Sequence, residues 1–267
     1  MNVHIVSRCG KRPQNEDKHN IITNLNNADK SIAPVNFYGI YDGHGGKYVS
    51  GYLSQMLPRF FLTKTAEYPL SGRYINSVYK AITKDLKQNH LKQASNCGST
   101  CLVAVEYKYK DNRYLDILNT GDSRCVICTD NVAVSKTKDH KPNWPEEQQR
   151  IKSLGGQVYF DGFDWRIKDL SVSRAFGDLD AHPFLTNRPD IYRHRIKKND
   201  KFIILACDGL WDVFDNQDAV NIVLGLCYDI KTGERKQTKV NVAKRLADLA
   251  IEKGSTDNIT VAVVFLN

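Results

Sequence analysis

Two short apolar runs of this chain each end directly in an Asp-Gly pair. Residues 37–41 (Phe-Tyr-Gly-Ile-Tyr) run into Asp42-Gly43, and residues 202–207 (Phe-Ile-Ile-Leu-Ala-Cys) run into Asp208-Gly209. Short runs rich in β-branched and aromatic residues, bounded by glycine and aspartate, are typical of buried strands. The glycine after each aspartate lets the backbone turn sharply or approach a ligand closely. We therefore expect two core strands that each present a carboxylate where the strand ends.

Two other acidic positions come just before strand-like runs. Glu16 and Asp17 precede the run 20–22, and Asp257 precedes the run 259–266. In an antiparallel pair, the end of one strand and the start of its neighbour lie at the same edge. Pairing of these runs with the two core strands would bring together Asp208 with Asp257, and Glu16 with Asp42.

Four carboxylates at one edge need positive charge nearby, because buried anions are costly when unpaired. Oxygen-rich, carboxylate sites suit hard divalent cations such as Mg²⁺ and Mn²⁺. The alternative is that each Asp-Gly pair only marks a turn after a strand. That alternative explains one such pair more easily than the whole set, so the sequence predicts a site for divalent cations.

Helical periodicity lies between the strand-like runs. Apolar residues recur at helical spacing over 75–86 and 242–250, and Pro145 and Gly155-Gly156 are placed to begin and end a further helix. The strands we expect are residues 20–22, 36–41, 100–107, 114–118, 124–129, 201–207 and 259–266. This order predicts packed sheets covered by helices, an α+β fold rather than a doubly wound parallel sheet. No repeat or linker is visible, so we expect residues 1–267 to form one domain.

Composition narrows the classes of protein that this chain can belong to. The apolar runs are strand-sized, so we expect no membrane span. Seven cysteines, an odd number, and no signal peptide indicate a reducing, intracellular setting; we expect the cytoplasm, with the nucleus as an alternative. The net charge is +8, but no nucleic-acid-binding motif is present, so we expect no nucleic-acid partner. The densest basic segment, 193–198, is either a solvated face or a docking surface for acidic phosphoprotein segments.

Nine motifs in order along nearly the whole chain resemble the metal-dependent protein phosphatase family, the protein phosphatase 2C type. They are Arg12-x-x-x-Glu16-Asp17, Tyr41-Asp42-Gly43-His44-Gly45-Gly46, Cys97-Gly98-Ser99-Thr100, Asn119-Thr120-Gly121-Asp122-Ser123-Arg124, Asp139-His140-Lys141-Pro142, Gly155-Gly156-Gln157-Val158, Ser171-Val172-Ser173-Arg174-Ala175-Phe176-Gly177-Asp178, Ala206-Cys207-Asp208-Gly209-Leu210-Trp211-Asp212-Val213 and Gly254-Ser255-Thr256-Asp257-Asn258. The resemblance implies a four-layer α-β-β-α sandwich in which helices flank two antiparallel sheets. It also implies a metal cleft at one end of the sandwich, which agrees with the strand-end argument.

The resemblance further implies a ligand set for two Mn²⁺ or Mg²⁺ ions. Asp42 would bridge both ions, and Gly43 would offer its backbone carbonyl to one of them. The remaining implied ligands are Asp208 and Asp257 for the other ion, Glu16 through bound water, and Asp122 with Asp212 for a weaker third ion.

The same resemblance implies that the chain would hydrolyse phosphoserine and phosphothreonine in proteins through a metal-activated water. We also expect it to be a monomer. Arg12 would hold the phosphate, since guanidinium matches phosphate in a two-pronged way. His44 would protonate the leaving oxygen. The alternatives are a surface arginine and a structural histidine.

Two points remain open at this stage. The segment 165–170 departs from the family pattern, so the specificity of the adjacent flap, about 158–165, is not predicted. The rival function is a phosphatase-like module that binds phosphoproteins without catalysis. Retention of Asp42, Asp208 and Asp257 favours an enzyme.

Overall fold

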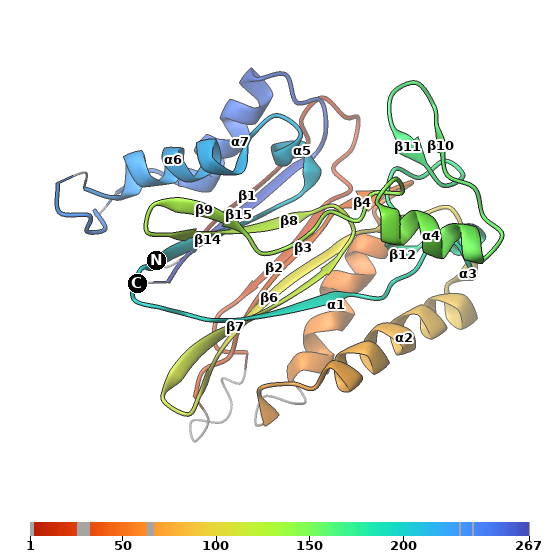
Figure 1. Ribbon diagram of the computed structural model, residues 1–267, viewed down its shortest axis with the longest axis horizontal. Helices are drawn as coiled ribbons and strands as arrows, with labels where there is room; N and C mark the ends of the chain where they lie inside the picture. Colours follow the sequence, from red (N-terminus) through yellow and green to blue (C-terminus); the bar gives the residue numbers. More distant parts are fainter. Residues whose placement is uncertain (1–2, 26–32, 63–66, 230, 237, 267) are drawn as a thin grey trace.

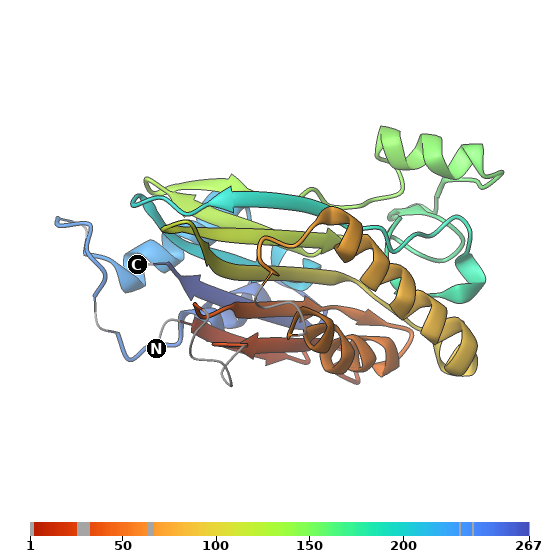
Figure 2. The same ribbon diagram turned by 90° about the horizontal axis from the view of Figure 1, so that it is seen from below.

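Two stacked antiparallel sheets form the centre of the computed structural model, which describes residues 3–25, 33–62, 67–229, 231–236 and 238–266 (Figures 1 and 2). The first sheet has the spatial order β1 (Val3–Arg8), β15 (Ile259–Phe265), β14 (Asp200–Ala206), β8 (Arg124–Thr129) and β9 (Val132–Ser135). The second has the order β13 (Asp190–Arg195), β7 (Asn112–Thr120), β6 (Cys101–Tyr109), β3 (Asn36–Tyr41) and β2 (Lys18–Ile22). All neighbouring strands in both sheets are antiparallel.

Helices cover the outer face of each sheet, as Figure 1 shows. The second sheet is covered by α1 (Tyr48–Leu62) and α2 (Gly72–Asn89), with α3 (Leu91–Ala94) following α2. The first sheet is covered by α5 (Asp208–Trp211), α6 (Asn216–Cys227) and α7 (Val242–Glu252). The layers therefore run helix, sheet, sheet, helix.

Smaller elements gather at one end of the sandwich. One is a small sheet in the order β12 (Phe176–Gly177), β5 (Gly98–Ser99) and β4 (Gly43–His44), followed by the 3₁₀ turn η2 (Leu179–Ala181). The others are α4 (Pro145–Ser153) and a hairpin of β10 (Tyr159–Phe160) and β11 (Trp165–Arg166). Figure 2 shows α4 standing apart from the long strands at this end.

Three buried clusters fill the spaces between the layers. Alternate residues of β14 divide between two of them. Phe202 and Ile204 face α6 and α7, whereas Ile203 and Leu205 face the second sheet. A strand covered on both faces needs apolar residues at successive positions, which accounts for the unbroken apolar run before Asp208. The third cluster lies between the second sheet and helices α1 and α2.

The predicted α+β sandwich is confirmed, as are both predicted strand pairings. Leu205 of β14 lies opposite Ala262 of β15, and Asn20 of β2 lies opposite Gly39 of β3. Helix α4 begins at Pro145, as predicted. Within the described residues, no helix is both long and apolar enough to cross a membrane.

Strand β13 is absent from the predicted strands, because three of its residues belong to the basic segment 193–198. It is an edge strand, so its side chains are only partly covered and charge dominates its sequence. Arg193 is ion-paired with Asp116 on the neighbouring strand at 2.7 Å, and His194 lies 2.7 Å from Asp200. Arg193 and His194 of this basic segment are therefore paired with carboxylates of the fold itself.

Candidate metal centre and active site

A cavity of about 560 Å³ opens where β3 and β14 end. Eight of the nine residues predicted for the site line it, namely Arg12, Glu16, Asp42, Gly43, His44, Asp122, Asp208 and Asp257. Asp212, the ninth, is not among the lining residues and is exposed. It lies one helical turn after Asp208, and its N–H donates to the Asp208 carbonyl at 2.8 Å.

The centre of the cavity is a tight group of carboxylates. Oxygens of Asp42, Asp122 and Asp208 all lie within 4.8 Å of one another, and so do ligand atoms of Asp17, Asp42 and Cys207. Asp42 belongs to both groups. The sequence prediction placed Asp122 at a weaker third site, whereas the fold brings it directly against Asp42 and Asp208. Glu16, Gly43 and Asp257 line the cavity outside these two groups.

Two of these aspartates carry oxygens that call for a partner. Oδ1 of Asp17 and Oδ1 of Asp122 are buried and have no hydrogen-bond partner among the residues that the structure describes. Burial, and then the charge of Asp208, raise the pKa of Asp42 well above its usual range. Burial and the charge of Asp122 do the same to the pKa of Asp208. Hard divalent cations with oxygen ligands would satisfy these groups, so the residues present fit Mg²⁺ or Mn²⁺.

Two glycines allow the backbone segments of the site to approach this closely. A Cβ at Gly43 would lie 2.4 Å from the Glu16 carbonyl oxygen. A Cβ at Gly209 would lie 2.0 Å from the Asn258 carbonyl oxygen. Both glycines follow a strand-end aspartate, so each Asp-Gly pair sets a carboxylate beside a second acidic segment. From the sequence we expected each glycine to allow a sharp turn or a close approach to a ligand; in the structure the close neighbour is another backbone segment.

Asp17 is a site residue that the prediction did not include. It is buried, and its Oδ2 accepts a hydrogen bond from Thr260 Oγ1 at 2.6 Å. Burial is the main cause that raises its pKa to about 6. Its position beside Glu16 was visible in the sequence, but only the folded structure shows that it lies against Cys207 and Asp42.

Lys141 is a second residue that the prediction did not include. Its Nζ lies 2.5 Å from Oδ2 of Asp122. Burial alone would lower the pKa of Lys141, but the charge of Asp122 outweighs burial and raises it above its usual value. The ammonium therefore stays charged and neutralises part of the carboxylate group. The motif at 139–142 was the only sequence signal for this residue.

Asp178 is the third addition, and it contacts the predicted general acid. His44 Nε2 and Asp178 Oδ2 are 2.6 Å apart, and Asp178 is 4% exposed. The small sheet of β4, β5 and β12 holds them side by side: a Cβ at Gly98 would lie 1.9 Å from Asp178 Oδ2 and 2.5 Å from His44 Nε2. Burial lowers the pKa of His44, but the hydrogen bond and charge of Asp178 outweigh it, so the pKa is raised.

Arg12 lies at the rim of the cavity. Its side chain is 56% exposed, and its guanidinium is 2.8 Å from Oδ2 of Asp257. A predicted phosphate-binding cation is thus ion-paired with a predicted metal ligand. The exposed position leaves the guanidinium accessible from solvent.

Comparison with known proteins identifies the family. A family model described as Protein phosphatase 2C matches residues 1–259. The chain belongs to the protein phosphatase 2C family. This places it among the metal-dependent protein serine/threonine phosphatases, which agrees with the acidic cavity.

The matches to curated relatives of this phosphatase cover different shares of those proteins. The Integrin-linked kinase-associated serine/threonine phosphatase 2C of Mus musculus is 34% identical over 294 residues, which cover 98% of this chain and 71% of the relative. The PP2C-like domain-containing protein R307 of Acanthamoeba polyphaga mimivirus is 40% identical over 169 residues, which cover 57% of this chain and 94% of the relative. Probable protein phosphatase 2C 2 of Arabidopsis thaliana is 33% identical, and the match spans 66% of its length.

Solved structures share the fold of this phosphatase. A C. elegans sex determining protein superposes with a TM-score of 0.86 at 25% identity, covering 99% of this chain and 64% of that one. A serine-threonine phosphatase 2C from Toxoplasma gondii superposes with a TM-score of 0.80 at 24% identity, covering 98% and 94% of the two chains. The latter likeness bears on the fold alone.

Proposed function

We propose that this phosphatase hydrolyses phosphoserine and phosphothreonine in proteins with the help of Mn²⁺ or Mg²⁺. The observation that carries the proposal is the group of Asp42, Asp122 and Asp208, whose oxygens lie within 4.8 Å of one another at the base of the cavity. Three acidic side chains so close together, with an orphaned buried oxygen among them, suit an ion that interacts with phosphate.

The residues that would hold the ions surround Asp42. In the proposal they are Asp42, the Gly43 carbonyl, Asp208, Asp257 and Glu16, with Asp122 and Asp212 for a weaker further ion. When bound, such ions polarise phosphoryl oxygens and make water more acidic at neutral pH. Because Asp122 lies close to Asp42 and Asp208, we propose that it contributes more to ion binding than the exposed Asp212 does.

Arg12 would bind the phosphate as it enters. Its guanidinium carries several donors in a planar fork and can make two parallel hydrogen bonds to phosphate oxygens. Among the described residues its one ion pair is with Asp257, and that pair is exposed enough to exchange. A short rotation of an exposed side chain would therefore bring it to the substrate.

His44 would give a proton to the serine or threonine oxygen as the phosphorus–oxygen bond breaks. Asp178 accepts at Nε2, so a protonated His44 ring has its Nδ1–H left for donation. The raised pKa of His44 keeps the ring protonated to a higher pH than a free histidine. Asp178 acts here through His44, as a positioning residue.

The direct test is hydrolysis of a phosphothreonine peptide with Mn²⁺ or Mg²⁺, before and after exhaustive chelation. We expect turnover only with the ion, restored when the ion is added back. Full activity after chelation would contradict the proposal. Binding of the peptide without any turnover would instead support the rival function of a phosphoprotein-binding module.

We also propose that residues 1–267 act as one catalytic unit, as a monomer, in a reducing compartment such as the cytoplasm. All seven cysteines are free, and six of them are buried. Sedimentation of the purified chain would test the monomer. Fractionation of the source cells would test the compartment.

A further inference from the structure

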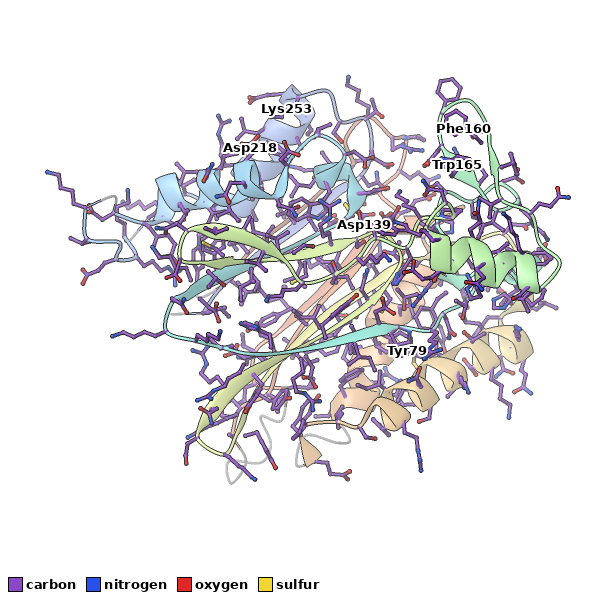
Figure 3. All side chains as sticks on the ribbon, in the orientation of Figure 1. Tyr79, Asp139, Phe160, Trp165, Asp218 and Lys253 are labelled. Atoms are coloured by element: carbon purple, nitrogen blue, oxygen red, sulfur yellow. The ribbon has the colours of Figure 1, made fainter. Side chains whose placement is uncertain are left out.

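An exposed group of aromatic side chains lies beside the cavity and takes no part in the chemistry above. The side chains belong to the β10–β11 hairpin: Tyr159 is 44% exposed, Phe160 55%, Phe163 94% and Trp165 36%. Figure 3 shows Phe160 and Trp165 on this hairpin, which stands clear of the two sheets in Figure 1. We call these four residues the aromatic platform. Of the four, Phe160 and Trp165 contact each other across the strands, and Phe163 at the turn is almost fully exposed. Exposed apolar surface of this kind marks an interaction site.

The hairpin holds the platform in a fixed shape. Oδ1 of Asp161 accepts hydrogen bonds from the backbone N–H groups of Phe163 and Asp164, at 2.8 and 2.7 Å. Its Oδ2 accepts from Arg166 Nε at 2.7 Å. The Phe160 and Trp165 rings pair across the strands, with centroids 5.6 Å apart. A turn tied in this way presents Phe163 to solvent without the entropy cost of ordering a free loop on binding.

The platform is continuous with the catalytic cavity. Arg166 and Lys168, from the same hairpin and the segment after it, line the cavity. The Lys168 ammonium donates to the Asp180 carbonyl, which ties the base of the hairpin to another part of the cavity wall. An extended peptide advances about 3.3–3.6 Å per residue. Because Arg166 and Lys168 belong to the cavity wall, residues a short way from a phosphorylated side chain in the cavity can reach the hairpin.

We propose that the aromatic platform binds an apolar side chain of the substrate that is close in sequence to the phosphoserine or phosphothreonine. This inference rests on the proposed function and specifies its substrate class: phosphosites flanked by leucine, isoleucine or phenylalanine. Asp161 and Arg166 are ion-paired with each other at 2.7 Å, so neither is free to bind a charged residue of the substrate. The exposed rings offer apolar contact and little else.

The test compares two phosphothreonine peptides that differ only in having leucine or serine at the flanking positions. Wild type should show the lower KM with the leucine peptide. Phe163→Ala and Trp165→Ala should each raise that KM about 10-fold, the usual cost of truncating an aromatic anchor. Their constants for the serine peptide and for p-nitrophenyl phosphate should stay unchanged. Both side chains are on the surface, so thermal melting should match wild type.

Tyr109→Ala is the matched control. Tyr109 is 39% exposed and ends β6 at the far end from Thr100, which lines the cavity. It should change none of these constants. A leucine preference that survives Phe163→Ala and Trp165→Ala would overturn the proposal, and so would an equal loss with all three substrates.

Failure of the proposed function would look different. In that case wild type would hydrolyse neither peptide nor p-nitrophenyl phosphate in Mn²⁺. Calorimetric titration of the same two peptides would then test peptide binding by the aromatic platform independently of catalysis. Tighter binding of the leucine peptide, lost in Phe163→Ala, supports it, and equal binding of the two peptides refutes it.

Discussion

Asp178→Asn removes the charge that holds His44 while keeping the size of the side chain. The lost interaction is a buried, charge-assisted hydrogen bond of 2.6 Å. Such bonds are worth about 1.5–3 kcal/mol, which corresponds to a loss of about 10- to 150-fold in rate if the bond acts fully in the transition state. We expect a fall of this size in kcat for a phosphothreonine peptide. His44→Gln, which removes the acid itself, should cost more, about 10²–10⁴-fold.

The assay compares two leaving groups at fixed, saturating Mn²⁺. The nitrophenolate of p-nitrophenyl phosphate needs little protonation, so Asp178→Asn and His44→Gln should slow its release much less than that of threonine. The double variant should lose no more than His44→Gln alone, because Asp178 acts through His44. Asp218→Asn, at an exposed carboxylate on α6 outside the cavity lining, serves as the control. Equal losses for both leaving groups would refute proton donation by His44, and additive losses would refute the positioning role of Asp178.

Two further predictions follow from ion pairs in the structure. Arg12→Ala should lower kcat/KM for a phosphopeptide about 10- to 100-fold, the worth of hydrogen bonds to a charged group, and leave the melting temperature unchanged. Arg245→Ala, an exposed arginine on α7, is its control, and near-normal kinetics of Arg12→Ala would reject phosphate binding. Glu147 is buried; burial raises its pKa, but Arg174 and Arg150 outweigh burial and lower it to about 2. Because that pKa is depressed, its stabilisation is present above about pH 4.5 and is lost as the pH falls towards the folded value. Glu147→Gln should therefore reduce the free energy of unfolding by about 3 kcal/mol at pH 7 but by little at pH 2, and a pH-independent deficit would contradict this.

The parts of the site that follow from local sequence were predictable. Asp42 and Asp208 each end an apolar strand and precede a glycine, and antiparallel pairing places Asp257 beside Asp208 without further information. The strand runs themselves stood out because both faces of β3 and β14 are covered. For β3 and β14, the apolar sequence pattern therefore matches the burial of both faces in the structure.

The rest of the site depends on contacts between distant segments. Asp178 lies 134 positions from His44, and Lys141 lies 19 positions from Asp122. Nothing in the local pattern of an aspartate or a lysine shows which side chain it will face. Strand β13 was missed for a different reason: an edge strand lacks cover on one side, so its charged residues hide the alternation of a buried strand.

The central claim, that the carboxylates around Asp42 hold the ions needed for hydrolysis, is tested most directly by Asp208→Asn. Calorimetric titration of Mn²⁺ should be paired with phosphothreonine hydrolysis for wild type, Asp208→Asn and Asp215→Asn, the last an exposed aspartate just beyond the site. Asp208→Asn should lose nearly all turnover and bind Mn²⁺ more weakly, since a neutral amide is a poorer ligand for a hard cation. Its stability without metal should be unchanged or higher, because crowded carboxylates repel one another. Asp215→Asn should behave as wild type. Wild-type activity and Mn²⁺ affinity in Asp208→Asn would contradict the account.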